Sequence, residues 1–473
     1  MSISLSKKDI YWSYLAQFFS LASGIIILPM VLRMLSTEEI AMNYLMLTIG
    51  SLVALFDFGF APQFGRNITY IFSGVQELKK ENISIVEKHT GINYRLLATM
   101  ISTAQFVYRR LALLVLSIML TLGTLYIYHI THGFTTVKNS LLIWCIYSLS
   151  TFFNIYYSYF NSLLTGRGLI MESKKAMVFS RIAYLILSFG LLYLGMGLVG
   201  LSLANLITPF VNRYISYYYF FTKDIKENIN TIFITRKEKY DLFKKIWYNS
   251  KKLGLVFIGS YAISKLSMFL AGLFLSLDEV ASYGLMIQLV GLIMTVSTTL
   301  FYAYNPIFSA LRVEHNNDKL IRTFAFTMNI YYLLFIIGSL FLIFIIPWLL
   351  QLVGSNAVLP NNNIVILFCF IMFLEGNHSC FSTMIVTKNK IPFVESSLIA
   401  GAVIAIGDYL SLAFTSLGIW GLVLVQGITQ IVYANWKWPF EICKEFGITP
   451  INFLKLGFKS SLEKFAKYRY VYK

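Results

Sequence analysis

The chain has 473 residues, of which 57% are hydrophobic and only 13% are charged, and its formal net charge is +17. A soluble chain is about half apolar and about a quarter charged, so a mean hydropathy of +0.67 excludes an ordinary soluble domain and indicates an integral membrane protein. The Leu-, Ile- and Phe-rich runs are continuous and do not alternate, which favours transmembrane helices over a β-barrel.

The apolar runs are separated by polar or glycine-containing segments, and a run of about 20 residues is enough to span a bilayer. We predict twelve spans, at residues 11–34, 42–62, 111–131, 139–164, 177–195, 198–220, 253–276, 280–304, 324–350, 363–387, 392–415 and 417–436. The expected fold class is therefore an all-α polytopic membrane protein with twelve transmembrane helices.

The distribution of Lys and Arg predicts the orientation, because these residues concentrate in cytoplasmic loops. With the N-terminus inside, all of the 39 Lys and Arg residues except Arg33, Lys138 and Lys265 lie in or beside cytoplasmic segments. Such loops face anionic lipid head groups, so the net charge implies membrane lipids as partners and no nucleic acid. We expect a multi-pass membrane protein with both termini in the cytoplasm.

Two phrases occur twice along the chain. LSTEEIAMNYLML at 35–47 matches LSLDEVASYGLMI at 275–287, and GLVGLSLANLIT at 197–208 matches GIWGLVLVQGIT at 418–429. In both pairs the copies are six predicted helices apart, and they lie on the same side of the membrane. This pattern predicts a parallel internal repeat of two six-helix lobes, an arrangement common among secondary transporters.

The repeat divides the chain into four parts. We predict an N-terminal six-helix lobe (1–222), a basic cytoplasmic linker (223–252), a C-terminal six-helix lobe (253–440) and a basic amphipathic cytoplasmic tail (441–473). Apolar residues recur in the tail at three- and four-residue steps, which is typical of a helix lying on a membrane surface. They are Ile451, Leu454, Phe458, Leu462 and Phe465.

A charged side chain at the centre of a span costs on the order of 2.5–3.5 kcal/mol, so it needs a partner or a wet cavity. Lys265 lies at the centre of the seventh predicted span and Glu375 at the centre of the tenth. Two interpretations of Lys265 stay open. It contacts an anionic substrate in a wet cavity, or it forms a structural pair with Glu375.

Glu375 and Asp408 are candidates for an ion-coupling site that binds a proton or sodium. The alternative is that these carboxylates form hydrogen bonds with Asn377, His378 or Tyr409. Asp57 lies in the cytoplasmic half of the second predicted span, in the sequence DFGFAP, and it is the third ion-coupling candidate. Its alternative role is to accept hydrogen bonds from loop amides where the helix ends.

Arg33 and Arg66 lie near the ends of the first two spans, either as substrate contacts or as anchors at the membrane interface. Gln288 and Asn305 are amides within or beside the eighth span. Amides can bind sugar hydroxyls, but in membranes they also hold helices together. No spacing typical of a metal site occurs, so we expect no cofactor apart from a coupling ion.

Four motifs carry a resemblance to a known family: LPMVLRMLSTEE (28–39), LFDFGFAPQFGRN (55–67), SLLTGRG (162–168) and GLVGLSLA (197–204). On these motifs the chain resembles the polysaccharide transport family, whose members flip lipid-linked oligosaccharides such as O-antigen units. That family belongs to the superfamily that includes the MATE antiporters. Ala41 departs from the pattern, because the family often has Gly in this turn.

The resemblance implies two lobes arranged in a V around a cavity that opens alternately to each side. It also implies a location in the bacterial inner (cytoplasmic) membrane and an undecaprenyl-diphosphate-linked oligosaccharide as substrate. A proton or sodium gradient would be the driving force, and the polysaccharide polymerase machinery is a candidate partner. One alternative is a multidrug cation antiporter of the same superfamily. A membrane polysaccharide polymerase is a weaker alternative, because the outside connections are short and hold no acid–base pair. We therefore expect a transporter and not an enzyme.

Overall fold

The computed structural model describes residues 7–57, 59–78, 91–313, 316–386 and 393–471. Within these ranges every regular element is helical, which confirms the predicted fold class at that level. Contacts between residues divide the chain into two compact units, Met1–Tyr261 and Ala262–Lys473.

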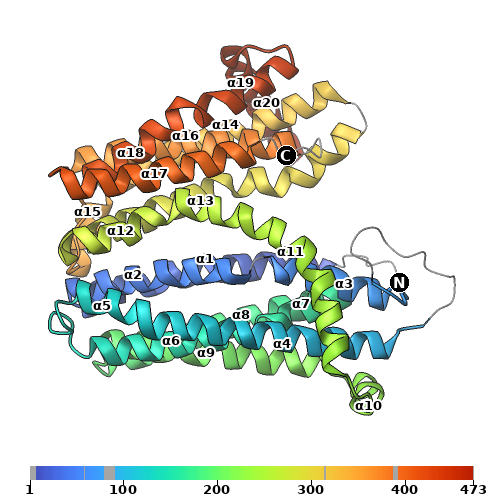
Figure 1. Cartoon of the computed structure of the whole chain (residues 1–473). Coiled ribbons are helices and arrows are strands. Elements are labelled where there is room, and N and C mark those ends of the chain that lie inside the picture. The colour runs from blue at the N-terminus through green and yellow to red at the C-terminus, as the bar shows by residue number, and fades with distance from the viewer. Residues whose placement is uncertain (1–6, 58, 79–90, 314–315, 387–392, 472–473) are drawn as a thin grey trace. The chain divides into compact units, whose positions relative to one another are not determined.

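The N-terminal unit is drawn from blue to yellow-green in Figure 1. Its helices are α1 (Lys7–Met34), α2 (Thr37–Ala54), η1 (Leu55–Asp57), α3 (Phe60–Phe72), α4 (Tyr94–Ile118), η2 (Met119–Gly123), α5 (Thr124–Ile130), α6 (Ser140–Tyr157), α7 (Tyr159–Arg167), α8 (Ile170–Tyr193), α9 (Gly197–Phe220), α10 (Lys223–Asn230) and, as far as Tyr261, α11 (Arg236–Ser264). Helix α8 packs between α1 and α9, α6 packs against α4 and α9, and α3 packs against α7.

An aromatic cluster fixes one end of the N-terminal unit. Phe60 at the start of α3 stacks on Trp247 of α11, with ring centroids 5.6 Å apart, and Phe64 packs against Tyr108 of α4. Phe60, Phe64 and Tyr108 are all buried. This packing holds the start of α3 against α4, which determines where the preceding residue Asp57 lies.

The C-terminal unit continues the chain from Ala262. Its helices are α12 (Leu266–Phe274), α13 (Leu277–Val313), α14 (Asn317–Phe344), α15 (Ile346–Val353), α16 (Asn362–Val386), α17 (Val394–Phe414), α18 (Ile419–Val432), α19 (Ala434–Glu445) and α20 (Pro450–Val471). The principal contacts are between α13 and α14, α14 and α20, α16 and α19, and α17 and α18.

Eight helical segments of the described residues are long and apolar enough to cross a membrane. They are Thr37–Asp57, Tyr94–Ile130, Ser140–Arg167, Ile170–Tyr193, Leu277–Tyr302, Asn317–Phe344, Asn362–Ile385 and Val394–Phe414. Phe18–Met34 is apolar but shorter. The chain is thus a multi-pass helical protein, and the count of twelve spans stays a prediction.

Several predicted spans are interrupted in the structure. The span predicted at 253–276 is broken at Lys265, whose φ and ψ of −134° and −22° separate α11 from α12. The span predicted at 324–350 is broken at Ile345, one residue before α15, in which Pro347 lacks the N–H that a continuing helix needs. A hydropathy pattern averages over many residues, so it did not reveal these single-residue breaks.

The repeated phrase has the same local structure in both units. Ser36 and Glu39 form a reciprocal cap at the start of α2, with N–H to side-chain oxygen distances of 3.1 and 3.2 Å. Ser276 and Glu279 form the matching cap at the start of α13, at 3.1 and 3.3 Å. In each cap, two backbone N–H groups that have no partner within the helix donate hydrogen bonds to side-chain oxygens. This need explains the Ser-x-x-Glu spacing.

Each capping glutamate also meets the glycine that begins the second repeated phrase. Glu39 Oε1 accepts a hydrogen bond from the Leu198 N–H at 3.1 Å, next to Gly197. In the other unit, Glu279 Oε1 lies 3.5 Å from where a Cβ on Gly418 would stand. Both glycines have a φ of +52°, which other residues rarely adopt. The two repeated phrases therefore meet inside each unit, although the full repeat stays a prediction.

The predicted tail helix is present as α20. Phe453 is buried against Phe324 of α14 and Phe381 of α16. On the opposite face an apolar row remains exposed: Ile451, Leu454, Phe458 and Leu462. The side chain of Phe465 lies outside the described residues. The exposed row has the geometry predicted for contact with a membrane surface.

Candidate functional site

Asp57 joins two helices of the N-terminal unit. The predicted span 42–62 ends earlier than expected, because η1 stops at Asp57 and Gly59 turns the chain with a φ of +72°. One carboxylate oxygen, Oδ2, accepts a hydrogen bond from the Ala61 N–H at 3.1 Å, in the first turn of α3. The other, Oδ1, accepts one from the Tyr108 hydroxyl of α4 at 2.6 Å. Asp57 therefore does accept a backbone hydrogen bond, but from an amide in the first turn of α3 and not from a loop amide. The ion-coupling role stays a prediction.

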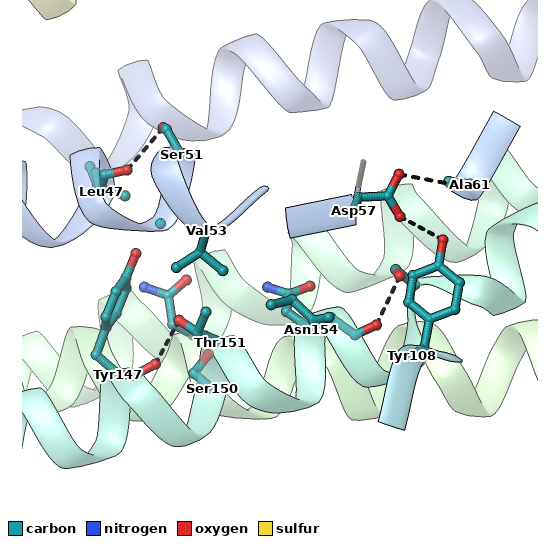
Figure 2. Close-up of a pocket in the computed structure, with 14 residues that line it drawn as sticks. Leu47, Ser51, Val53, Asp57, Ala61, Tyr108, Tyr147, Ser150, Thr151 and Asn154 are labelled. Atoms are coloured by element: carbon teal, nitrogen blue, oxygen red, sulfur yellow. Dashed lines mark hydrogen bonds between the residues drawn. The ribbon is translucent and has the colours of Figure 1, made fainter. Parts of the chain in front are cut away.

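A cavity of about 520 Å³ opens beside Asp57, within the N-terminal unit. Figure 2 shows its lining, to which α2, η1, α3, α4 and α6 contribute, with Asn205 added from α9. Its polar residues are Ser51, Asp57, Tyr108, Tyr147, Ser150, Thr151, Asn154, Ser158 and Asn205. A cavity of this size with several polar groups in its wall can hold water or a small polar ligand.

One face of α6 supplies most of the polar wall. Tyr147, Thr151, Asn154 and Ser158 follow one another at steps of three or four residues, which places them on the same face of a helix. The Tyr147 hydroxyl donates to the Met46 carbonyl at 2.7 Å, and Thr151 donates to the Tyr147 carbonyl at 2.9 Å. These hydroxyls are therefore already bonded to backbone.

The amides are the groups that remain available in this cavity. Asn154 and Asn205 line it, and no hydrogen bond joins either side chain to another residue of the described chain. Each amide offers donors and an acceptor. Together with the Asp57 carboxylate, they could bind a hydrated cation or hydroxyl groups.

Tyr108 and the α6 face were not among the predicted site residues. The sequence contained a signal for the α6 face, because its polar residues recur with the period of a helix. It contained none for Tyr108, which meets Asp57 only because the aromatic cluster packs α3 against α4.

Lys265 lies at the break between α11 and α12, and its side chain is exposed. No ion pair connects it to Glu375 or to any other carboxylate of the described residues. The structure therefore lacks the proposed structural pair, and it leaves an ammonium group inside a predicted span. The role of this group in substrate binding stays a prediction.

Glu375 of α16 lies beside His378, with 3.5 Å between Oε2 and the imidazole Nδ1. The same nitrogen is 3.1 Å from the Asn435 side-chain oxygen of α19. Asn377 does not contact Glu375 in this way, because its oxygen accepts a hydrogen bond from Tyr332 at 2.7 Å. Of the alternative partners proposed for Glu375, His378 is the one that the structure brings close.

Asp408 of α17 is fully buried, at 0% exposure. Ser267 of α12 and Tyr283 of α13 lie beside it. No hydrogen bond from a described residue reaches either carboxylate oxygen under normal geometry. Tyr409 packs its ring against Phe274 instead. A buried carboxylate in this position is stable when a proton or a cation neutralises its charge.

The remaining predicted residues lie at separate places in the two units. Arg33 is exposed in the last turn of α1, and exposed Arg66 donates a hydrogen bond to Gln63 within α3. Gln288 and Asn305 are half-buried in α13. Within the described ranges, no group of three or more His, Cys, Asp or Glu residues could hold a metal ion.

No family model matches the chain, and no curated protein matches it in sequence. Solved structures match it over nearly its whole length. An inward-facing MATE-family multidrug transporter of the MOP superfamily gives a TM-score of 0.62 at 17% identity, covering 93% of this chain and 99% of that one. The lipid II flippase MurJ, in an inward closed conformation, gives 0.61 at 16% identity, covering 97% and 92%.

A third match is the MATE multidrug transporter DinF-BH in complex with a ligand, at a TM-score of 0.59 and 14% identity, covering 95% of this chain and 98% of that one. Identities this low establish a shared fold and leave the substrate open. The chain therefore shares the fold of these transporters, and membership of their superfamily stays a prediction.

Proposed function

We propose that the chain is a flippase for a lipid-linked oligosaccharide. Its substrate would be an undecaprenyl-diphosphate-linked unit of the O-antigen type, moved from the cytoplasmic to the outer leaflet of the bacterial inner membrane by alternating access. The fold it shares with the lipid II flippase MurJ supports this proposal. The product would then be available to polysaccharide polymerase machinery, and the chain itself would perform no covalent chemistry.

The observation that carries the proposal is the exposed ammonium of Lys265. A charge within a span costs several kcal/mol unless water or an opposite charge accompanies it, and no described carboxylate pairs with it. A helix break at the same residue exposes backbone groups that also need polar partners. A diphosphate group satisfies both requirements, whereas a cationic drug would be repelled.

The other predicted contacts fit the two parts of such a substrate. Arg33 and Arg66 are exposed guanidinium groups near span ends, where a diphosphate enters or leaves the membrane. Gln288 and Asn305 are half-buried amides in α13 that suit sugar hydroxyls. These assignments are part of the proposal and rest on the chemical type of each side chain.

Multidrug cation antiport is the second candidate function. It is favoured by the shared fold with MATE multidrug transporters, one of them in complex with a ligand. Carboxylates inside the units, Asp57 and Asp408, also suit a cationic substrate. The two functions need substrates of opposite charge. Only the flippase is expected to depend on the positive charge of Lys265, so a variant of this residue distinguishes them.

Lys265→Ala should reduce polymer export about tenfold or more in cells that lack their own flippase, because a charge-assisted hydrogen bond contributes about 1.5–3 kcal/mol. Lys265→Arg should retain most of the export, since it keeps the positive charge. Surface polymer is quantified by immunoblot, with the level of the chain in the membrane measured in parallel.

Lys319→Ala is the matched control, because Lys319 is an exposed lysine in the same unit, in the first turn of α14. It should leave export unchanged. Full export by Lys265→Ala would contradict the anion contact. Export of a cationic dye by the wild-type chain, without polymer export, would favour the antiporter.

A further inference from the structure

A second cavity lies within the N-terminal unit, apart from Asp57. It has a volume of about 790 Å³ and is lined by α4, α6 and the start of α11. Four basic side chains line it: Arg109 and Arg110 from α4, and Arg236 and Lys239 from α11. No acidic residue is part of the lining. Like charges that converge on one space repel one another, so a bound anion would be stabilised there.

Most of this positive charge is not compensated by the protein. Within the described part of the chain, Arg109, Arg236 and Lys239 form no ion pair with a carboxylate. Glu238 is the acid nearest to them along α11, but its Oε1 accepts a hydrogen bond from Arg95 at 2.7 Å, and its Oε2 accepts one from the Thr235 N–H at 2.8 Å. Its negative charge is therefore already engaged.

The cavity also lies at the point along α4 where charged residues are followed by an apolar segment without charges. Residues 111–130, directly after Arg110, contain no Asp, Glu, Lys or Arg. Leu113 lines the cavity and is 47% exposed. It follows Arg109 by four residues, so both lie on one helix face about 6 Å apart along the axis. Leu113 thus adds an exposed apolar surface next to the cationic residues of the cavity.

We propose that this cavity binds the head group of an anionic phospholipid from the cytoplasmic leaflet. The phosphodiester lies among Arg109, Arg236 and Lys239, and an acyl chain extends along Leu113. Guanidinium groups suit phosphate because their fork of donors matches its oxygens, and basic pockets beside membrane helices are suited to lipid head groups. A free phosphate would use only the cationic residues. The site binds a lipid of the bilayer and not the transported substrate.

The test measures lipid binding by the purified full-length chain in nanodiscs of phosphatidylcholine, with increasing fractions of phosphatidylglycerol. The wild-type chain should bind phosphatidylglycerol preferentially. Arg109→Gln with Lys239→Gln should weaken that binding on the order of 30-fold, about fivefold for each charge removed. Arg109→Lys with Lys239→Arg keeps both charges and should retain the preference.

The matched control is Lys237→Gln with Lys319→Gln, which removes the same charge from two exposed lysines that do not line the cavity. An equal loss in this control would overturn the proposal. Binding of glycerol 3-phosphate as tight as that of phosphatidylglycerol would show that the acyl chain plays no part, and would overturn it as well. So would a preference for undecaprenyl diphosphate over phosphatidylglycerol.

One measurement needs no variant, so it stays informative if a substituted chain fails to fold. Raising NaCl from about 50 mM to about 500 mM should weaken phosphatidylglycerol binding to the wild-type chain, because salt screens the attraction between exposed charges. Binding that does not depend on salt would contradict a charge-based site. Neither measurement depends on transport, so the result is independent of the proposed function.

Discussion

Two glycines show how single residues join the repeated phrases. Gly197 and Gly418 both have a φ of +52°. A Cβ on Gly197 would stand 2.8 Å from Glu39 Oε1, closer than normal contact, whereas one on Gly418 would stand 3.5 Å from Glu279 Oε1. Gly197→Ala should therefore reduce the free energy of unfolding by about 2 kcal/mol or more. Gly418→Ala should reduce it by about 1–3 kcal/mol, because a φ of 52° with a ψ of −126° is a backbone conformation open mainly to glycine. Thermal unfolding in detergent measures both.

Two other glycines serve as controls for this prediction. Gly190 of α8 and Gly291 of α13 are helical, and a Cβ on either would meet nothing within 4 Å. Alanine at these positions should leave stability unchanged or raise it, because alanine is the better helix former. An equal loss for all four variants would show that the backbone of Gly197 and Gly418 is not the cause.

The helix cap at the start of α11 depends on pH. The Thr235 N–H, the Arg95 guanidinium and the Thr235 hydroxyl all donate to Glu238, which lowers the pKa of its carboxyl to about 2. Because the pKa is lower in the folded chain than the ordinary value of about 4.3, the stabilisation is present above that value and is lost as pH falls toward 2. Hydrogen exchange of the first turn of α11, corrected for its intrinsic pH dependence, should accelerate over this window.

Glu238→Gln provides the comparison for the cap. Glutamine keeps an acceptor for the Thr235 amide but has no charge for Arg95, so the first turn of α11 should exchange faster at neutral pH and lose its pH dependence below about 4.3. Asp241→Asn, an exposed acid in the next turn, should change neither. If the wild-type chain and Glu238→Gln behaved alike, the cap would not depend on the charge.

Apolar runs predicted that the chain is built of helices, but they did not show where these helices are interrupted, and the count of twelve spans stays a prediction. The run around Lys265 is apolar on both sides, so only the structure shows that α11 and α12 are separate. The polar face of α6 was not predicted, but the sequence contains a signal for it, because Tyr147, Thr151 and Ser158 recur with the period of a helix. The helix caps at the starts of α2 and α13 could be predicted from the sequence in the same way, because Ser-x-x-Glu is a local pattern.

For the whole molecule, the duplicated phrases and the motifs predicted a transporter fold, and the chain does share its fold with solved transporter structures. The contact between Asp57 and Tyr108 lies beyond such reasoning. The two residues are 51 positions apart, and the packing of Phe60 and Phe64 brings them together. Likewise, the sequence placed Glu375 and Lys265 at similar depth, and depth alone did not determine whether they pair.

Under the proposed function, energy coupling would involve the whole molecule, and buried carboxylates are the candidates for it. Asp408 is the strongest of them, because it is fully buried and no described residue donates a hydrogen bond to it under normal geometry. A proton or sodium ion bound there in one state and released in another would link a gradient to alternating access. Asp408→Asn removes the charge with little change in shape. In proteoliposomes it should abolish the response of transport to an imposed proton or sodium gradient while exchange without a gradient continues.

Glu375→Gln and Asp57→Asn test the other two candidates in the same vesicles. Asp57 already has two hydrogen-bond donors, at 3.1 and 2.6 Å, so its loss should also lower stability, by about 1–3 kcal/mol for the weakened bonds. Asp318→Asn in the exposed first turn of α14 is the matched control and should respond to the gradient like the wild-type chain. If all three candidate variants kept the full gradient response, none of these carboxylates would couple transport to an ion, and the driving force would have to act elsewhere.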